Sequence, residues 1–235
     1  MVDTILIPFD LPNPDPVSPV LVEDLSSLDV VLFGHYDVPE QTPTALAREQ
    51  FESEMEEVLE ELAEPFGREG ATVRTRLVFG KDRTAAIDQV AIEEYCAAEL
   101  DPAPTDGIAR ILVPVPDVAE FERLPRFVDI LCEDSTTEIT LFHVVEGEER
   151  YERGEEILEE TRAGMAEVGF DPERIGTLVS DAGDHDEEII RVGSEYDAVV
   201  MYEAESRLGD RIFGTLPDRV RDSTGNPVIV VRRDY

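Results

Sequence analysis

The sequence has little of several features that would define its class at once. Its 235 residues contain no tryptophan and only two cysteines, Cys96 and Cys132, which do not stand at the spacing of a metal site. A reduced, structural role is therefore predicted for both thiols. No apolar run approaches the roughly 18 residues of a membrane span, and the chain enters residues 4–7 without a basic leader. We expect a cytoplasmic protein with no membrane partner.

Positive charge, and lysine above all, is scarce. Twenty basic residues face 55 acidic ones, which gives a net charge of -35, and Lys81 is the one lysine. High net charge often marks disorder, but here the apolar residues fall into strand-length and helix-length blocks from end to end, which favours a folded chain. An acidic, lysine-poor composition resembles that of proteins from salt-accumulating halophiles. Such a surface disfavours nucleic acid as a partner.

Apolar blocks of two lengths alternate along the whole chain. In the first half they predict strands at 4–9, 29–34, 72–79 and 96–100, a long helix with Thr42 as its N-cap and Pro43 as its first residue, and a helix at 84–95. In the second half they predict strands at 111–115, 139–143, 177–179, 197–201 and 228–231, with helices at 118–132, 148–168, 184–193 and 210–222. Strands that alternate with helices favour an α/β fold with doubly wound, mainly parallel sheets.

The second half repeats the pattern of the first about a hundred residues later, which is typical of a duplicated domain. Residues 111–115 repeat 5–9, and 139–143 repeat 30–33 with His35 just beyond. Residues 101–107 are rich in proline and contain Asp-Gly, which is typical of a hinge. We therefore predict two domains, 1–104 and 108–235, of which the first lacks a final helix and strand.

The last stretch, 197–232, reads as a strand, a loop, a helix, a turn and a strand. This stretch resembles the end of universal stress protein domains, in which the loop is patterned Gly-x2-Gly-x9-Gly-Ser/Thr. Gly214-Thr215 matches the closing pair, and 227–232 matches the Pro-Val-led final strand. The resemblance implies two tandem universal stress protein-like domains, the first truncated. Because members of the family commonly pair domain to domain, it also implies a pseudo-dimer within the chain with 228–231 near its interface, and leaves a homodimer open.

The resemblance also implies where a nucleotide would bind. In nucleotide-binding members an Asp at the end of the first strand contacts adenine, and the Gly-rich backbone with the Ser/Thr hydroxyl holds the phosphates of ATP, which binds with Mg²⁺. Both leading glycines of the loop are missing here, since Met201 and Ala204, or Tyr202 and Glu205, occupy their positions. The candidate residues of this degenerate site are Asp10, Asp117, Gly209, Gly214 and Thr215.

Each candidate also has a structural alternative. Asp117 stands one residue late because Pro116 takes the matching position, and Gly214-Thr215 also suits the turn that starts any helix after a strand. The triplet 184–186, Asp-His-Asp, could suggest a metal site, but Asp184 is better placed as a helix N-cap. His35 and His143 are predicted to be packing residues, so no metal site and no catalytic residue is expected.

These observations predict a stress-response regulatory protein that has largely lost ATP binding, needs no cofactor and acts through an unidentified protein partner. The alternative is an ATP-binding member of the family, which could hydrolyse ATP slowly. The loop after the strand at 197–201 separates the two, because it lacks its glycines and carries Glu203 and Glu205, whose charges repel phosphate.

Overall fold

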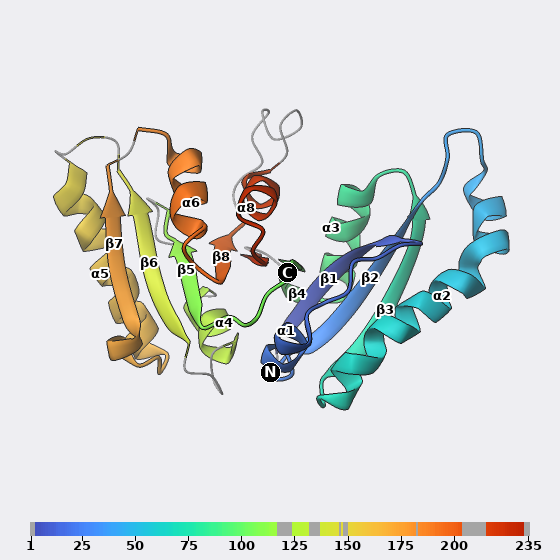
Figure 1. The fold of residues 1–235 in the computed structure, drawn as a ribbon, viewed down its shortest axis with the longest axis horizontal. Coiled ribbons are helices and arrows are strands. Elements are labelled where there is room, and N and C mark those ends of the chain that lie inside the picture. Colours follow the sequence, from blue (N-terminus) through green and yellow to red (C-terminus); the bar gives the residue numbers. More distant parts are fainter. Residues whose placement is uncertain are drawn as a thin grey trace. The chain divides into compact units, whose positions relative to one another are not determined.

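The chain divides into two compact units, residues 1–100 and 101–233. The computed structural model describes residues 3–116, 124–131, 137–145, 147, 150–181, 183–203 and 215–232. Both units are of the α/β class, with parallel strands joined by helices (Figure 1). Among the described residues no helix is both long and apolar enough to cross a membrane.

Unit 1 is a four-stranded parallel sheet in the order β3-β2-β1-β4. Its elements in chain order are β1 (Thr4–Leu11), α1 (Pro19–Asp24), β2 (Asp29–Asp37), α2 (Thr44–Arg68), β3 (Thr72–Gly80), α3 (Arg83–Glu93) and β4 (Cys96–Asp101). Residues 102–109 are described in full and form neither helix nor strand. The chain therefore passes from β4 to the next strand without a helix or strand between them.

Helices α2 and α3 cover opposite faces of this sheet. They contact alternate residues of β2, because successive side chains of a strand point to opposite sides. Val31 and Phe33 of β2 pack with Ile87 and Val90 of α3 in one buried cluster. On the other face, a Cβ at Gly34 would lie 3.0 Å from Leu59 of α2, so the glycine lets that helix pack closely. Figure 1 shows the strands of unit 1 between these two helices.

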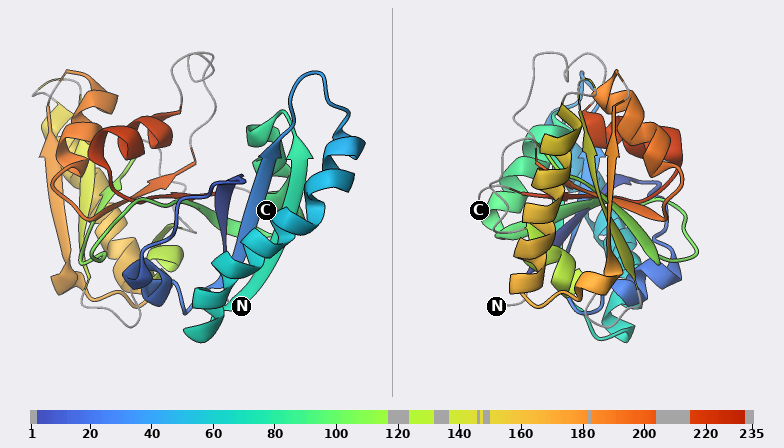
Figure 2. Two further views of the ribbon diagram at one scale, coloured as in Figure 1. Left: turned by 45° about the vertical axis from the view of Figure 1, so that its right-hand side comes forward. Right: turned by 90° about the vertical axis from the view of Figure 1, so that its left-hand side faces the viewer.

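Unit 2 is a five-stranded parallel sheet in the order β9-β8-β5-β6-β7. Its elements are β5 (Arg110–Pro114), α4 (Leu124–Leu131), β6 (Glu138–Val144), α5 (Tyr151–Glu167), a 3-10 turn (Pro172–Arg174), β7 (Ile175–Ser180), α6 (His185–Gly193), β8 (Ala198–Tyr202), α8 (Leu216–Thr224) and β9 (Val228–Val231). Phe142 packs with Ile189 of α6 and Val220 of α8, whereas Gly154 of α5 lies against His143. The second view in Figure 2 shows this sheet between α5 and α6.

The structure corrects two predicted helix starts. Thr42 is not the N-cap of the long helix: Pro43 holds that position in an extended conformation, and α2 begins at Thr44. The last helix does not run from residue 210, because Thr215 is extended, with ψ at 161°, and α8 begins at Leu216. In both places the residue before the helix has an extended backbone. The helix therefore starts after that residue, even where the apolar spacing of the sequence continues across it.

Candidate functional site

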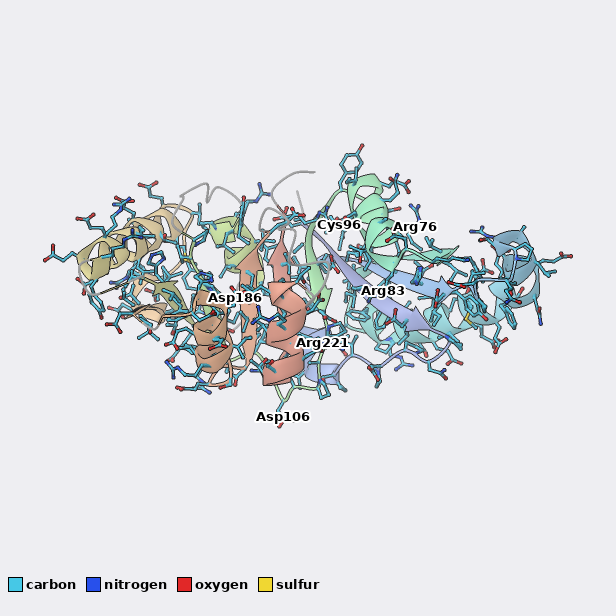
Figure 3. The ribbon with its side chains drawn as sticks, turned by 90° about the horizontal axis from the view of Figure 1, so that it is seen from above. Arg76, Arg83, Cys96, Asp106, Asp186 and Arg221 are labelled. Atoms are coloured by element: carbon cyan, nitrogen blue, oxygen red, sulfur yellow. The ribbon has the colours of Figure 1, made fainter. Side chains whose placement is uncertain are left out.

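The carboxyl end of β1 in unit 1 carries Asp10, the residue that the resemblance assigns to adenine. Its side chain is exposed and accepts a 2.7 Å hydrogen bond from Nε of Arg83, the first residue of α3. Figure 3 marks Arg83. An adenine that donated a hydrogen bond to the Asp10 carboxylate would have to share it with the guanidinium of Arg83.

His35 is next to Asp10 in the sheet, because the two residues are paired in the β1–β2 register. It lies inside β2 rather than beyond it, and it is buried at 3% exposure with its ring stacked near Phe33. Its Nε2 has no hydrogen-bond partner in the described part of the chain and faces the backbone of Gly80, where a Cβ would be 3.7 Å away. Burial lowers the pKa of this imidazole, and Arg83 adds to the effect. His35 is therefore a buried packing residue, as predicted.

His143 has the equivalent place on β6 of unit 2 and is also buried. Its Nδ1 lies 2.7 Å from the carbonyl oxygen of Val115. The ring also contacts α5, since a Cβ on Gly154 would be 3.1 Å from its Cδ2. The prediction of a packing role is confirmed for this histidine too.

Thr215 is the N-cap of α8 and forms a reciprocal capping box with Asp218. The Thr215 backbone N–H donates to Asp218 Oδ2 at 2.8 Å, and the Thr215 hydroxyl lies 2.7 Å from the same oxygen. The Asp218 N–H points back at the Thr215 hydroxyl at 3.4 Å. A carboxylate of the chain itself thus occupies the positive end of the helix, where an anionic ligand would be attracted.

The other nucleotide candidates are not brought together by the described residues. Asp117, Gly209 and Gly214 lie outside the part of the chain that the structure describes. Asp10 belongs to unit 1 and Thr215 to unit 2. Residues 102–109, which follow β4 of unit 1 along the chain, contain no helix start that could face a phosphate.

The Asp184–Asp186 triplet is used for structure. Asp184 is the N-cap of α6 and accepts from the Glu187 N–H at 3.0 Å, which confirms its predicted role. Asp186, marked in Figure 3, pairs with Arg219 of α8 at 2.7 Å. No group of three metal-ligating side chains that could hold an ion is found in the described ranges.

One buried polar cluster has no obvious sequence signal. Glu188 of α6 is 5% exposed, accepts from Ser180 Oγ at 2.6 Å, and is bonded by Arg191 at 2.6 and 2.8 Å. The Arg191 bonds hold the pKa of the Glu188 carboxyl below its usual range. In the sequence, Glu188 follows other Asp and Glu residues at the start of α6, so nothing there distinguishes this buried carboxylate from its solvated neighbours.

Comparison with known proteins identifies the fold. The chain matches no protein-family model, and no curated protein matches it by sequence. Among solved structures it resembles a universal stress protein from Archaeoglobus fulgidus, with a TM-score of 0.69 and 15% identity over 99% of this chain and 97% of that one. It also resembles a putative universal stress protein from Pseudomonas aeruginosa, with a TM-score of 0.55 and 16% identity over 98% and 93% of the two chains.

A third neighbour is of a different kind. It is the cytoplasmic domain of a prokaryotic cation chloride cotransporter, with a TM-score of 0.52 and 9% identity over 98% of this chain and 95% of that chain. The likenesses to the two universal stress proteins show that this chain has their fold. At such low identities they show the fold alone.

Proposed function

We propose that this chain is a universal stress protein-like regulatory module that acts through protein contacts in a salt-rich cytoplasm and has lost high-affinity ATP binding. It is built of two such units, the first truncated after β4. The role needs neither a cofactor nor a catalytic residue. Since the same fold also serves in a cotransporter's cytoplasmic domain, the fold by itself does not assign one activity.

The observation that carries this proposal is the capping box at the start of α8. In the family pattern, the hydroxyl at Thr215 and the N–H groups beside it would meet phosphate. Here the Asp218 carboxylate takes both the Thr215 N–H and the Thr215 hydroxyl. A phosphate would have to displace this carboxylate or approach it, and either step costs free energy that a glycine-lined loop avoids.

The surroundings of the other half-site support the same conclusion. Asp10 is already engaged by Arg83, and unit 1 has no helix after β4 to hold phosphates near it. The net charge of -35 adds a general repulsion of polyphosphate, which salt and Mg²⁺ would only reduce.

Nucleotide content after purification tests the proposal. The chain is purified in molar KCl with Mg²⁺, denatured with acid, and its released nucleotide is quantified by chromatography. The proposal expects far less than one nucleotide per chain. Close to one ATP per chain would overturn it in favour of the alternative, an ATP-binding universal stress protein.

A variant makes the test sharper. Asp218→Ala releases the Thr215 hydroxyl and removes one negative charge at the start of α8. If Asp218 alone blocked an otherwise intact site, this variant would retain ATP. Because the glycines of the loop are also missing, we expect it to remain empty, with Arg219→Ala as a control on the same helix.

A further inference from the structure

We propose that a groove on unit 1, between the proline-rich loop after β1 and the second half of α2, is a docking site for a basic, amphipathic segment of a partner protein. This inference rests on the proposed function, because it names the class of partner for a module that acts through protein contacts. The groove has a volume of about 690 Å³.

The shape of the groove is set by stiff elements. Pro12, Pro14 and Pro16 form one wall, and their rings fix the backbone of the loop. Residues of the second half of α2 form the other wall. A groove with such walls exists before a ligand arrives, so binding loses little conformational entropy.

Its floor and sides offer an apolar contact. Val22 of α1 and Phe66 of α2 are buried beneath it, and Val58 and Leu62 of α2 are half-buried along its side. An aliphatic side chain of a partner would bury its surface here against carbon atoms. This contact would give an anchor of the kind that dominates binding at protein interfaces.

The charged groups of the groove are all acceptors, and beside them Asn13 brings a side-chain amide. Asp15 and Glu61 are the charged residues among the described residues that line it, and both are acidic and exposed. Prolines have no N–H to donate, and Pro65 stands inside α2 four residues after Glu61, so the Glu61 carbonyl lacks its usual helical donor. The groove therefore calls for an occupant that brings donors and positive charge.

Arginine or lysine beside an aliphatic anchor satisfies both demands. Guanidinium and ammonium groups only donate hydrogen bonds, and they would pair with Asp15, Glu61 and the Glu61 carbonyl. A second copy of this chain is a poor occupant, because 55 acidic residues against 20 basic ones leave it few cationic donors to place beside Asp15 and Glu61. Charge complementarity thus favours a basic partner.

Fluorescence anisotropy with defined peptides tests the docking site on the full chain in 1 M KCl. The probe is an acetylated and amidated octapeptide with two arginines on each side of four aliphatic residues. One control peptide has serines in place of the aliphatic residues, and another has glutamates in place of the arginines. We expect the probe to bind at least about tenfold more tightly than either control, since the groove needs both the anchor and the charge.

Charge-reversal variants locate the binding. Glu61→Arg should weaken the probe's binding about threefold to fivefold, because it replaces a pairing at contact distance, which molar salt screens least, with a repulsion. Glu60→Arg makes the same change on the neighbouring residue of α2, which is exposed and does not line the groove, and should alter binding less than about twofold. Leu62→Ser should weaken binding without a change of charge.

Three outcomes would overturn the docking site. Equal losses of affinity in Glu61→Arg and Glu60→Arg would assign the attraction to the acidic surface as a whole. If the probe does not bind at all, the groove is not a docking site for a basic, amphipathic segment. If the chain self-associates and Glu61→Arg abolishes that association, the occupant of the groove is a second copy of the chain. None of these affects nucleotide content, so a failed groove is distinguishable from a failed proposal of lost ATP binding.

Discussion

Thr215 is the residue at which a capping role and a phosphate-binding role compete. Its hydroxyl and N–H both meet Asp218, and its extended backbone ends the loop and starts α8. Sequence alone left both roles open, because Gly-Thr before a helix suits either one. The contacts of the Thr215 side chain support the capping role, and those contacts depend on Asp218, three residues away.

The capping role makes a prediction for stability. Thr215→Ala removes the hydroxyl that faces the Asp218 N–H and should lower the free energy of unfolding by about 1 kcal/mol. Thr215→Ser keeps the hydroxyl and should behave like the unaltered protein within a few tenths of a kcal/mol. Urea titrations in molar KCl measure both. An alanine variant as stable as the serine variant would show that the box contributes nothing.

His35 predicts a pH dependence in unit 1. Desolvation lowers the pKa of its imidazole in the folded state, with Arg83 in the same direction and Asp10, Asp37 and Asp82 opposing. The unfolded chain therefore binds the proton more readily. The stabilisation is present above the unfolded pKa of about 6.5, and it is lost as pH falls from there towards the lower pKa of the folded state.

A difference measurement isolates this residue from the many carboxylates. Unfolding free energies of the unaltered protein and of His35→Gln are compared from pH 7.5 to pH 5. The difference between them should shift against the unaltered protein as the pH falls below about 6.5. Parallel pH curves for the two proteins would contradict a depressed pKa at His35.

At the scale of elements, the sequence predicted strands better than helix ends. Continuous apolar runs such as those of β1, β5 and β9 are buried and lie in the predicted places, because only a parallel sheet covered on both faces buries every residue of a strand. The start of α8 was predicted too early, because helical periodicity does not reveal a residue with extended backbone. The groove beside α2 could not be predicted, since it depends on how the proline-rich loop lies against the helix.

Two glycines within α5 test how closely this helix packs on its sheet. A Cβ on Gly154 would lie 2.9 Å from Val145 Cγ1 and 3.1 Å from His143 Cδ2, whereas a Cβ on Gly164 would have nothing within 4 Å. Gly164→Ala should therefore stabilise the protein by about 0.5–1 kcal/mol through helix propensity alone. Gly154→Ala should destabilise it by about 1–3 kcal/mol, because the helix must move away from β6 and β7. Thermal unfolding measures both, and equal effects would contradict this packing.

At the scale of the whole molecule, the charge of -35 makes stability depend on salt. The screening length falls from about 30 Å at 0.01 M to about 3 Å at 1 M, so molar KCl removes most of the repulsion among surface carboxylates. The melting temperature should rise on the order of 10 °C over this range, which corresponds to a few kcal/mol.

A charge-reduced variant provides the control for this effect. Glu54, Glu57 and Glu60 are exposed on α2, and their joint replacement by Gln removes three negative charges without changing the core. The variant should melt higher than the unaltered protein in dilute buffer and show a smaller rise with salt. A melting temperature that stays flat from dilute buffer to molar KCl would contradict the proposed adaptation to salt.

The most direct test of lost ATP binding is calorimetric titration of the full chain with ATP and Mg²⁺ in 2 M KCl, where salt screens the general repulsion of phosphate. The capping box at Thr215, the engaged Asp10 and the missing glycines together predict no heat of binding at micromolar ATP. Saturable binding with a micromolar dissociation constant would contradict this account and would identify an ATP-binding protein.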